Sequence, residues 1–334
     1  MSSPLHRVLI IGVGSIGERH LRCFLATKRV AASFVEIQPE LRANISARYG
    51  VPGFATLEDA LREPPEIAVV CTPAPLHVPI AQKLVQHGIH VLIEKPLSTT
   101  CDGLQPLHDA VAGQGIVAAV AYVYRCHPVL AAMREAILDG RFGRPVELVA
   151  VTGQHFPIYR PAYRTIYYND RATGGGAIQD ALTHILNAGE WLVGPATRLV
   201  ADAGHLVLDG VTVEDTVHVL ARHKHVLASY SLNQHQAPNE LTISVICERG
   251  VARFEGHERR WRWMTEPGGA WHDEPVVPLE RDALFVAQAE RFLDAVEGRG
   301  PVPCTLEDGW QTLRVNLAAL ASADGGGWQT IEAT

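Results

Sequence analysis

Two residues on one predicted helix carry the side chains that a proton-transfer site needs. Asp180 and His184 are four positions apart, so a helix places them on one face. A histidine titrates near neutral pH and can take the proton of a hydroxyl group, while the carboxylate can hold the imidazole tautomer or bind a neighbouring hydroxyl. Two alternatives stay open: a hydrogen-bonded surface pair, or two ligands of a metal site, although no third ligand stands nearby in the sequence.

A lysine is the second candidate for chemistry. Glu94-Lys95-Pro96 follows the apolar segment Val91–Ile93, which predicts a buried strand. At the carboxyl end of such a strand, a lysine held by a following proline points toward the ligand-binding edge of an open α/β sheet. Its side chain can orient a hydroxyl or join proton transfer. The alternative is a surface turn, which is the commoner use of this tripeptide when it stands alone.

A glycine-rich run near the N-terminus predicts a dinucleotide-binding turn. Residues 12–17 read Gly-Val-Gly-Ser-Ile-Gly, follow the apolar strand Val8–Ile11 and open a helix. Gly12 permits the tight turn, Gly14 lets a pyrophosphate approach the backbone, and Gly17 lets helix and strand pack closely. The pyrophosphate would lie at the helix N-terminus, where free N–H groups and the helix dipole favour anions.

An acidic residue after the second predicted strand indicates which dinucleotide binds. Glu36 lies nineteen residues beyond the last glycine, where a carboxylate accepts hydrogen bonds from an adenosine ribose. A carboxylate repels a 2′-phosphate, and no arginine stands at position 37 or 38. The sequence therefore predicts NAD as the cofactor and disfavours NADP. The alternative for Glu36 is a solvated carboxylate at a strand end.

The elements around these residues alternate between strand and helix over the first part of the chain. Strands are predicted at Val8–Ile11, Ser33–Ile37, Ala68–Cys71, Val91–Ile93 and Val117–Val123. Short apolar strands separated by amphipathic helices predict a parallel, doubly wound sheet covered on both faces, which is an α/β Rossmann domain over residues 1–123. The loop that contains Thr72, Pro73 and His77 follows the third strand, at the edge where such sheets bind ligands.

The second half of the chain has a different pattern and predicts an α+β domain over residues 124–334. Several segments alternate in polarity and follow one another through short turns, which predicts a mostly antiparallel sheet that is polar or partner-covered on one face. We predict strands at Val146–Thr152, Leu199–Ala201, Thr216–Ala221, Val226–Asn233, Leu241–Cys247, Ala252–Glu255 and Arg260–Met264. Helices are predicted at Ala177–Leu192, at Leu284–Glu297 and from about Thr305.

The composition excludes several classes of protein. The 334 residues are 47% hydrophobic and 19% charged, which fits a folded globular chain. A net charge of -7 gives no general attraction to nucleic acid or to anionic lipid. The longest uncharged apolar run, Gly115–Tyr124, is shorter than the ~20 residues of a membrane-spanning helix. Six cysteines without a Cys-x-x-Cys pair predict reduced thiols in a cytoplasmic protein and no metal site.

Taken together, the motifs resemble those of the Gfo/Idh/MocA oxidoreductases, the relatives of glucose-fructose oxidoreductase and inositol dehydrogenase. The resemblance covers nearly the whole chain and rests on these elements, in order: residues 12–17, Glu36, Thr72–His77, Glu94–Pro96, Tyr124–Pro128, Gly174–His184 and Glu307–Trp310. One position departs from the pattern, because Asn187 stands where many relatives carry an acid.

The resemblance implies an activity and a set of site residues. It implies hydride transfer between NAD(H) and a carbinol or carbonyl of a sugar, polyol or sugar acid, with Lys95, Asp180 and His184 matching the catalytic trio. It also implies a large open-faced C-terminal sheet that pairs subunits into a homodimer or homotetramer. The predicted cofactor contacts are Gly12, Gly14, Ser15, Ile16, Gly17, Glu36, Thr72, Pro73, His77, Glu94, Lys95 and Arg125.

Three residues of the second half are candidates for binding the substrate, and two alternative functions stay open. His155, Tyr163 and Arg164 lie in a stretch rich in hydroxyls and cations and are candidates for binding the substrate, although a solvated loop with aromatic anchors explains them equally well. One alternative function is a glycosidase that keeps NAD bound and oxidises the sugar only transiently. Another is a non-catalytic NAD sensor, against which the presence of Lys95, Asp180 and His184 argues.

Overall fold

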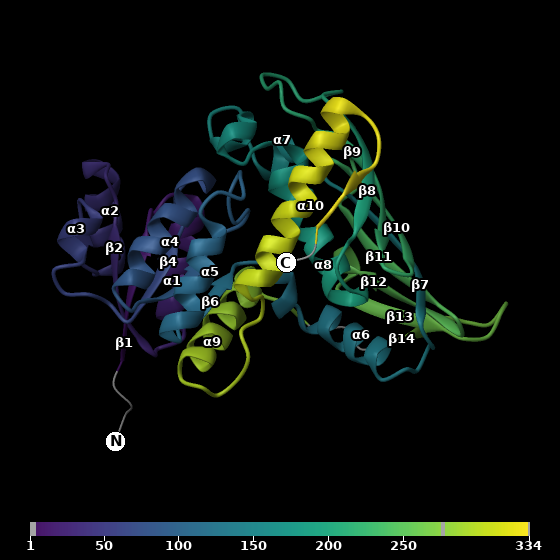
Figure 1. Ribbon diagram of the computed structural model, residues 1–334, viewed down its shortest axis with the longest axis horizontal. Coiled ribbons are helices and arrows are strands. Elements are labelled where there is room, and N and C mark those ends of the chain that lie inside the picture. Colours follow the sequence, from purple (N-terminus) through teal and green to yellow (C-terminus); the bar gives the residue numbers. More distant parts are fainter. Residues whose placement is uncertain (1–4, 275–277, 333–334) are drawn as a thin grey trace. The chain divides into compact units, whose positions relative to one another are not determined.

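The computed structural model describes residues 5–274 and 278–332, and these divide into two compact units (Figure 1). The first unit holds the chain up to Cys126 together with Glu280–Trp310, and the second holds His127–Leu279 and the chain from Gln311. The sequence predicts a division at residue 123, with residues 280–310 in the second domain. In the structure these residues belong to the first unit. They pack in the first unit because helix α9 (Ala283–Val296) contacts helix α1 (Ser15–Ala26).

A parallel sheet forms the centre of the first unit. Over the described residues it has six strands in the order β3-β2-β1-β4-β5-β6. The chain moves from β1 outward to β3 and then returns to the other side of β1 at β4, so the strand order reverses between β1 and β4. Ligands bind at this kind of reversal, outside the carboxyl ends of the strands. The strands are β1 (His6–Ile11), β2 (Val30–Val35), β3 (Gly53–Phe54), β4 (Ile67–Val70), β5 (His90–Ile93) and β6 (Ala118–Val120).

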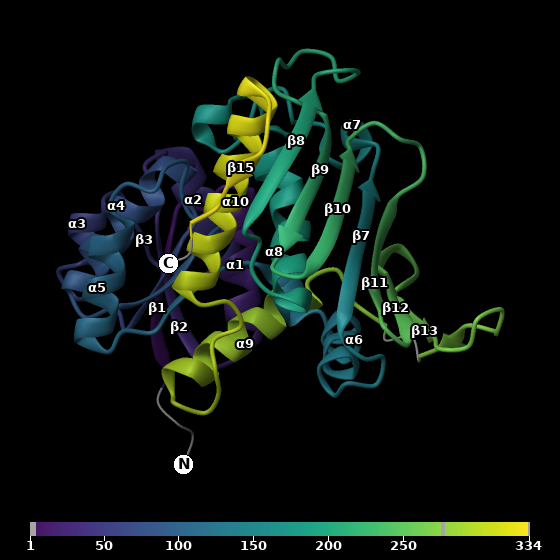
Figure 2. The same ribbon diagram turned by 45° about the vertical axis from the view of Figure 1, so that its right-hand side comes forward.

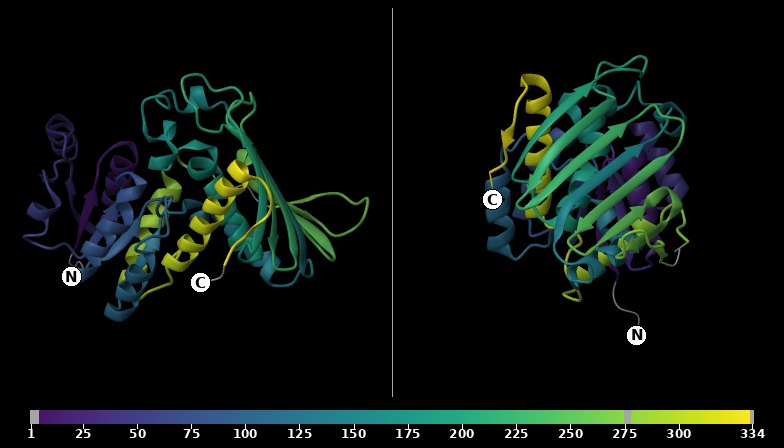
Figure 3. Two further views of the ribbon diagram at one scale, coloured as in Figure 1. Left: turned by 45° about the horizontal axis from the view of Figure 1, so that its top comes forward. Right: turned by 90° about the vertical axis from the view of Figure 1, so that its right-hand side faces the viewer.

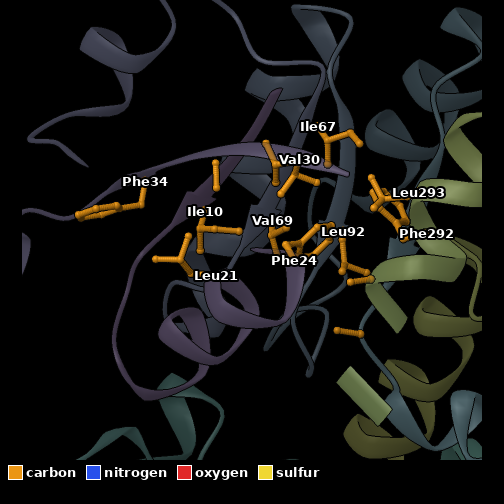
Figure 4. Packing of buried hydrophobic residues seen from close by; sticks show 14 of the residues in the cluster. Ile10, Leu21, Phe24, Val30, Phe34, Ile67, Val69, Leu92, Phe292 and Leu293 are labelled. Carbon is orange, nitrogen blue, oxygen red and sulfur yellow. The ribbon is translucent and has the colours of Figure 1, made fainter. Parts of the chain in front are cut away.

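Helices cover both faces of this sheet, which explains why its strands are apolar along their whole length. Helix α1 packs with α9, and α4 packs with α5. The core joins strand residues such as Ile10 and Val69 to Phe24 of α1 and Phe292 of α9, as Figure 4 shows. Each fully buried side chain of this kind contributes about 1.5–3 kcal/mol. The remaining helices are α2 (Pro39–Tyr49), α3 (Leu57–Ala60), α4 (His77–Gln86) and α5 (Leu104–Gln114).

A larger, mostly antiparallel sheet forms the second unit (Figure 2). In the described part of the chain it has nine strands in the order β14-β13-β12-β11-β7-β10-β9-β8-β15, with β7 and β10 as its parallel pair. The strands are β7 (Pro145–Gly153), β8 (Arg198–Gly204), β9 (Thr216–His223), β10 (Val226–Asn233), β11 (Glu240–Cys247), β12 (Gly250–Glu255), β13 (Arg260–Met264), β14 (His272–Asp273) and β15 (Gln329–Thr330).

The two faces of this second sheet differ. Side chains alternate along β9, so Val217 and Val219 are buried while His218 and Leu220 point to the other face. Helices α6 (Pro128–Leu138) and α8 (Thr183–Val193) pack against the buried face. Among the described residues of this unit, no helix covers the opposite face, which the right-hand view of Figure 3 shows directly. The shorter α7 (Phe156–Tyr159) precedes α8, and α10 (Leu306–Gly325) precedes β15.

Several predicted elements have different bounds in the structure. The second strand ends at Val35 rather than at Ile37, because Ile37 leaves the sheet and is 79% exposed. The strand predicted at Val117–Val123 is limited to β6, although Tyr122 and Val123 remain buried in the turn that follows. An apolar run alone does not separate a buried turn from a strand. The predicted helix at Ala177–Leu192 begins as a π-helix over Ile178–Leu182 and continues as α8.

Among the described residues, no helix is both long enough and apolar enough to span a membrane.

Phe292→Ala tests whether α9 belongs to the core of the first unit. Phe292 is fully buried in that core, so the truncation leaves a cavity and should destabilise the protein by about 3–5 kcal/mol. Urea unfolding followed by tryptophan fluorescence and circular dichroism measures the loss. Leu138→Ala is the control, because Leu138 is 57% exposed and its truncation should change the free energy of unfolding by less than about 0.5 kcal/mol. Equal effects of the two substitutions would contradict the assignment.

Candidate functional site

The glycine turn after β1 has the geometry that the sequence predicts. Gly12 adopts a φ of 82°, in the left-handed region, and its amide donates to the carbonyl of Val35 at 2.9 Å. A Cβ on Gly17 would lie 1.8 Å from the carbonyl oxygen of Gly12, so only glycine lets α1 approach the turn this closely. A Cβ on Gly14 would have no atom within 4 Å. The turn is therefore closely packed at Gly17, where it faces the Gly12 carbonyl, and open at Gly14.

The start of helix α1 lies on this open side. Gly14 is the N-cap residue and supplies no side-chain cap, and both Gly14 and Ser15 are exposed. The first N–H groups of a helix lack partners within the helix, so those of Ser15, Ile16 and Gly17 are available to an anion. This arrangement fits the pyrophosphate of a dinucleotide.

The Glu36 carboxylate is held beside the same turn. Glu36 directly follows β2 and is buried, with one carboxylate oxygen accepting from the Val13 amide at 3.2 Å and the other from the Gln38 amide at 2.9 Å. Arg42, which the sequence analysis did not single out, donates to the carbonyl oxygen of Glu36 at 2.6 Å. The carboxylate thus has a defined position next to the glycines, as an acceptor for a ribose requires. Together with the open space at Gly14, the residues present fit NAD.

Lys95 follows β5 at the same edge of the sheet. The preceding Glu94 is buried, and its carboxylate accepts from the Lys95 amide at 2.9 Å and lies 2.6 Å from Nε2 of His20. Burial alone would raise the pKa of Glu94, but the hydrogen bond and charge of His20 and the charge of Lys95 outweigh it and lower that pKa. Glu94 therefore carries a negative charge and contacts protein groups.

The loop after β4 contributes Thr72, Pro73 and His77. His77 is buried, and its ring nitrogens lie 2.7 Å from the Thr72 carbonyl oxygen and 3.0 Å from that of Pro96. Burial is the main cause that lowers the pKa of His77, so the ring is neutral near pH 7. His77 thus lies between two loops at the sheet edge, whereas Pro73 is exposed there. These contacts hold the His77 ring between the two loops, and its role as a cofactor contact stays a prediction.

Arg125 is the last predicted cofactor residue and lies at the end of the first segment of this unit. Its guanidinium is buried and donates to the carboxylate of Asp308 at 2.7 Å. Its carbonyl oxygen accepts from Arg291 of α9 at 3.2 Å. These contacts join the end of the first segment to the segment that returns late in the chain.

Asp180 of the second unit lies in the π-helical segment. The sequence predicts that Asp180 and His184 lie one turn apart in a regular α-helix. In the structure the backbone at Asp180 is instead π-helical, with hydrogen bonds between residues five apart. Asp180 is buried, and the hydroxyl of Tyr167 donates to its carboxylate at 2.6 Å. His184 follows in the first turn of α8 and is half-buried. Single π turns within helices occur frequently at functional sites.

A second buried carboxylate holds the beginning of this helix. Glu214 accepts from the Ile178 amide at 3.1 Å and from the guanidinium of Arg171 at 2.7 Å. A Cβ on Gly176 would lie 2.4 Å from the same carboxylate, so the glycine lets Glu214 reach the helix start. The sequence analysis missed Tyr167, Arg171 and Glu214. It offered no signal for them, because their partners are distant in sequence or depend on the path of an irregular segment.

The three predicted substrate residues lie in that irregular segment. Tyr163 is completely buried against Phe156 and Tyr168, and its hydroxyl donates to the carbonyl of Asp209 at 2.8 Å. In this placement Tyr163 packs within the protein, and its role as a substrate contact stays a prediction. Arg164 is exposed and donates to the same carbonyl at 2.9 Å. His155 is half-buried immediately before α7.

Two further observations bear on the predicted chemistry. Asn187 is buried and donates to the Thr312 hydroxyl at 2.9 Å, so its side chain contacts α10. Within the described ranges, no three His, Cys, Asp or Glu side chains gather in a way that could hold a metal ion.

Comparisons with known proteins give a consistent result. The NAD-binding Rossmann model of the GFO/IDH/MocA oxidoreductase family matches residues 6–122, and the C-terminal domain model of the same family matches residues 130–253. The chain is 24% identical to the levoglucosan dehydrogenase of Pseudarthrobacter phenanthrenivorans, over 96% of each chain. It is 26% identical to the UDP-N-acetylglucosamine 3-dehydrogenase of Acidithiobacillus ferrooxidans, over 94% of this chain and 95% of the relative.

The fold agrees with these sequence matches. A solved structure of levoglucosan dehydrogenase in complex with NADH superposes with a TM-score of 0.89 at 21% identity, and covers 99% of this chain and 100% of its own. At this identity the likeness establishes a common fold.

Two glycine substitutions separate folding from ligand binding at the turn. Gly17→Ala forces a Cβ into the Gly12 carbonyl and should destabilise the protein by about 3 kcal/mol or more. Gly14→Ala meets no protein atom, so its unfolding temperature should stay near that of the unmodified protein. The added methyl group lies where the pyrophosphate would approach, and NADH binding, measured by fluorescence, should weaken by about tenfold or more. Unchanged NADH affinity in Gly14→Ala would remove the turn from the cofactor site.

Proposed function

Because this chain belongs to the Gfo/Idh/MocA oxidoreductase family, we propose that it transfers a hydride between NAD(H) and a carbinol or carbonyl carbon of a sugar, polyol or sugar acid. One observation carries the proposal: a single edge of the first sheet bears both the open glycine turn after β1 and Lys95 after β5. A dinucleotide site and a side chain suited to the reacting oxygen therefore lie in the same unit.

The roles of the residues follow from their chemistry. Bound NAD supplies the hydride acceptor, and NADH the donor. The Lys95 ammonium stabilises negative charge that develops on the reacting oxygen, and His184 takes the proton of the hydroxyl in the oxidation direction. Asp180, with its carboxylate fixed by Tyr167, orients the histidine or a neighbouring substrate hydroxyl.

The Glu36 carboxylate supports NAD as the cofactor. Two backbone amides hold it in place, so it is preorganised to accept ribose hydroxyl groups and to repel a 2′-phosphate. Gly12, Gly14, Ser15, Ile16 and Gly17 form the proposed pyrophosphate site, and Thr72 and Pro73 lie at the same sheet edge. The six cysteines are all free thiols, which supports a cytoplasmic location. No observation favours the glycosidase or the sensor alternative.

A substrate screen tests the proposed activity. Purified protein is incubated with NAD and a panel of sugars, polyols and sugar acids while the absorbance of the reduced nicotinamide is followed. We expect NADH in proportion to oxidised product for at least one compound. Product formation without net NADH would instead indicate the glycosidase, and NADH binding without any turnover would indicate a sensor.

Lys95→Ala tests the proposed catalytic lysine. We expect turnover to fall by about 100-fold or more, because general acid–base and charge-stabilising groups contribute at least this factor. The affinity for NADH, measured by fluorescence, should change little. Lys83→Ala is the matched control, since Lys83 lies on α4 of the same unit and forms a surface ion pair with Glu58. Turnover of Lys95→Ala close to that of Lys83→Ala would exclude Lys95 from the mechanism.

The open face of the second sheet supports self-association. Leu220 of β9 and Leu227 of β10 are diagonal neighbours on this face and are 55% and 50% exposed. Antiparallel sheets normally bury one face, and exposed leucines on an uncovered sheet favour contact with another protein surface. The residues paired with Leu227 on the neighbouring strands are Arg222 and Glu147, whose opposite charges leave this part of the face without a net charge that would repel an identical face. We propose a second copy of this chain as the occupant, which gives a homodimer or homotetramer.

Light scattering after size-exclusion chromatography measures the oligomeric state. The unmodified protein should have the mass of at least a dimer, and Leu220→Glu combined with Leu227→Glu should shift it to the monomer, because the interface would bury unpaired charges. Leu206→Glu is the control: Leu206 is 67% exposed and lies in the loop between β8 and β9, outside the strands themselves. A monomeric unmodified protein would contradict the proposal.

A further inference from the structure

His20 lies on the cofactor helix but forms its shortest polar contact with the loop that carries Lys95. His20 is fully buried in α1, and its Nε2 lies 2.6 Å from one oxygen of the Glu94 carboxylate. The second oxygen of that carboxylate accepts from the backbone amide of Lys95 at 2.9 Å. One buried carboxylate therefore joins helix α1 to the backbone of Lys95.

The surroundings of His20 define which ring nitrogen carries the proton. The ring packs edge-on against Phe285 at 5.5 Å and lies 6.5 Å from Phe24, so it has an apolar environment. Its Nδ1 is buried and has no hydrogen-bond partner among the described residues. A proton on Nδ1 would be a buried donor without an acceptor, which is costly. Nε2 therefore carries the proton of the hydrogen bond to the Glu94 carboxylate, because an ionised carboxylate can only accept.

Two neighbours favour the ionised form of the Glu94 carboxylate and lower its pKa. His20 contributes its hydrogen bond and its charge, and Lys95 adds the charge of its ammonium group. This attraction is mutual, so the carboxylate also favours the ammonium. The other titratable groups near Glu94 are Cys71 after β4, whose thiol pKa is raised, and the buried His77 of α4, whose pKa is lowered, so both are neutral near pH 7. They offer no competing positive charge.

From these contacts we infer that His20 and Glu94 are positioning residues for Lys95, and that they couple the cofactor-binding helix to the catalytic loop. The inference rests on the proposed function, in which Lys95 acts on the reacting oxygen. His20 lies in the second turn of the same helix whose N-terminus would bind the pyrophosphate. Because Glu94 bonds both His20 and the Lys95 amide, a displacement of α1 also displaces the backbone of Lys95.

The first experiment needs neither substrate nor cofactor. The carboxyl carbon of Glu94 is followed by ¹³C NMR during a pH titration of the protein alone, and Glu94→Gln identifies its signal. We expect the pKa of Glu94 to lie below the usual glutamate value and to rise in His20→Leu, which removes the donor, but to change less in His20→Gln, whose amide keeps a donor near Nε2. An equal pKa in His20→Leu and in the unmodified protein would overturn the inference.

The second experiment measures the coupling to Lys95. His20→Leu should lower kcat by about tenfold or more, the factor expected for a lost hydrogen bond to a charged group, and His20→Gln should restore most of it. In a Lys95→Met background, His20→Leu should cause no further loss, because its effect acts through the lysine. A purely structural role would lower turnover by the same factor in both backgrounds and would overturn the inference.

A control variant tests whether any change near β5 lowers kcat. His90→Leu removes the hydrogen bond from the Val117 amide to the His90 ring at the opposite end of β5, so it perturbs the same strand and should leave kcat within about twofold. If no compound in the panel is turned over, the proposed function fails. The NMR titration then still decides whether His20 and Glu94 form the pair.

Discussion

The close approach of helix α1 to the end of strand β1 is the constraint on which the first unit depends. It requires Gly17, because any Cβ there would overlap the Gly12 carbonyl. Helix α1 therefore starts at the carboxyl edge of the sheet, and its N-terminus is aimed at the position where β4 and β5 also end. The same helix carries His20 to Glu94, so one packing contact positions both the dinucleotide site and the Lys95 loop.

Buried carboxylates perform the fine positioning in both units. Glu94 holds the Lys95 amide in the first unit, and Glu214 holds the start of the Asp180 helix in the second. A carboxylate without partners would be too costly to bury, so each is matched by several donors. Such a group tolerates only a narrow range of positions, because a small displacement breaks several charge-assisted hydrogen bonds together. This intolerance suits residues that must place a reactive neighbour within a fraction of an ångström.

The cofactor end was predictable because its chemistry is local. The left-handed turn at Gly12, the helix start and the acid at position 36 all follow from residues close in sequence or separated by one strand–helix unit. Contacts between residues far apart in the sequence could not be predicted. Tyr163 was chosen as a substrate contact but is buried, while Tyr167, four residues later, bonds Asp180. In an irregular segment no period indicates which of several tyrosines points inward, and the return of α9 to the first unit has no local signal either.

By itself, the amino-acid sequence determined the fold class, the dinucleotide turn, the preference for NAD and the identity of Lys95, Asp180 and His184 as reactive candidates. Only the tertiary structure decided which side chains support them: His20 through Glu94, Tyr167 on Asp180, and Arg171 with Glu214 at a π-helical turn. The physical reason is that backbone conformation and apolar periodicity are encoded over a few residues. The partner of a buried polar group, in contrast, is selected by packing between segments far apart in the chain.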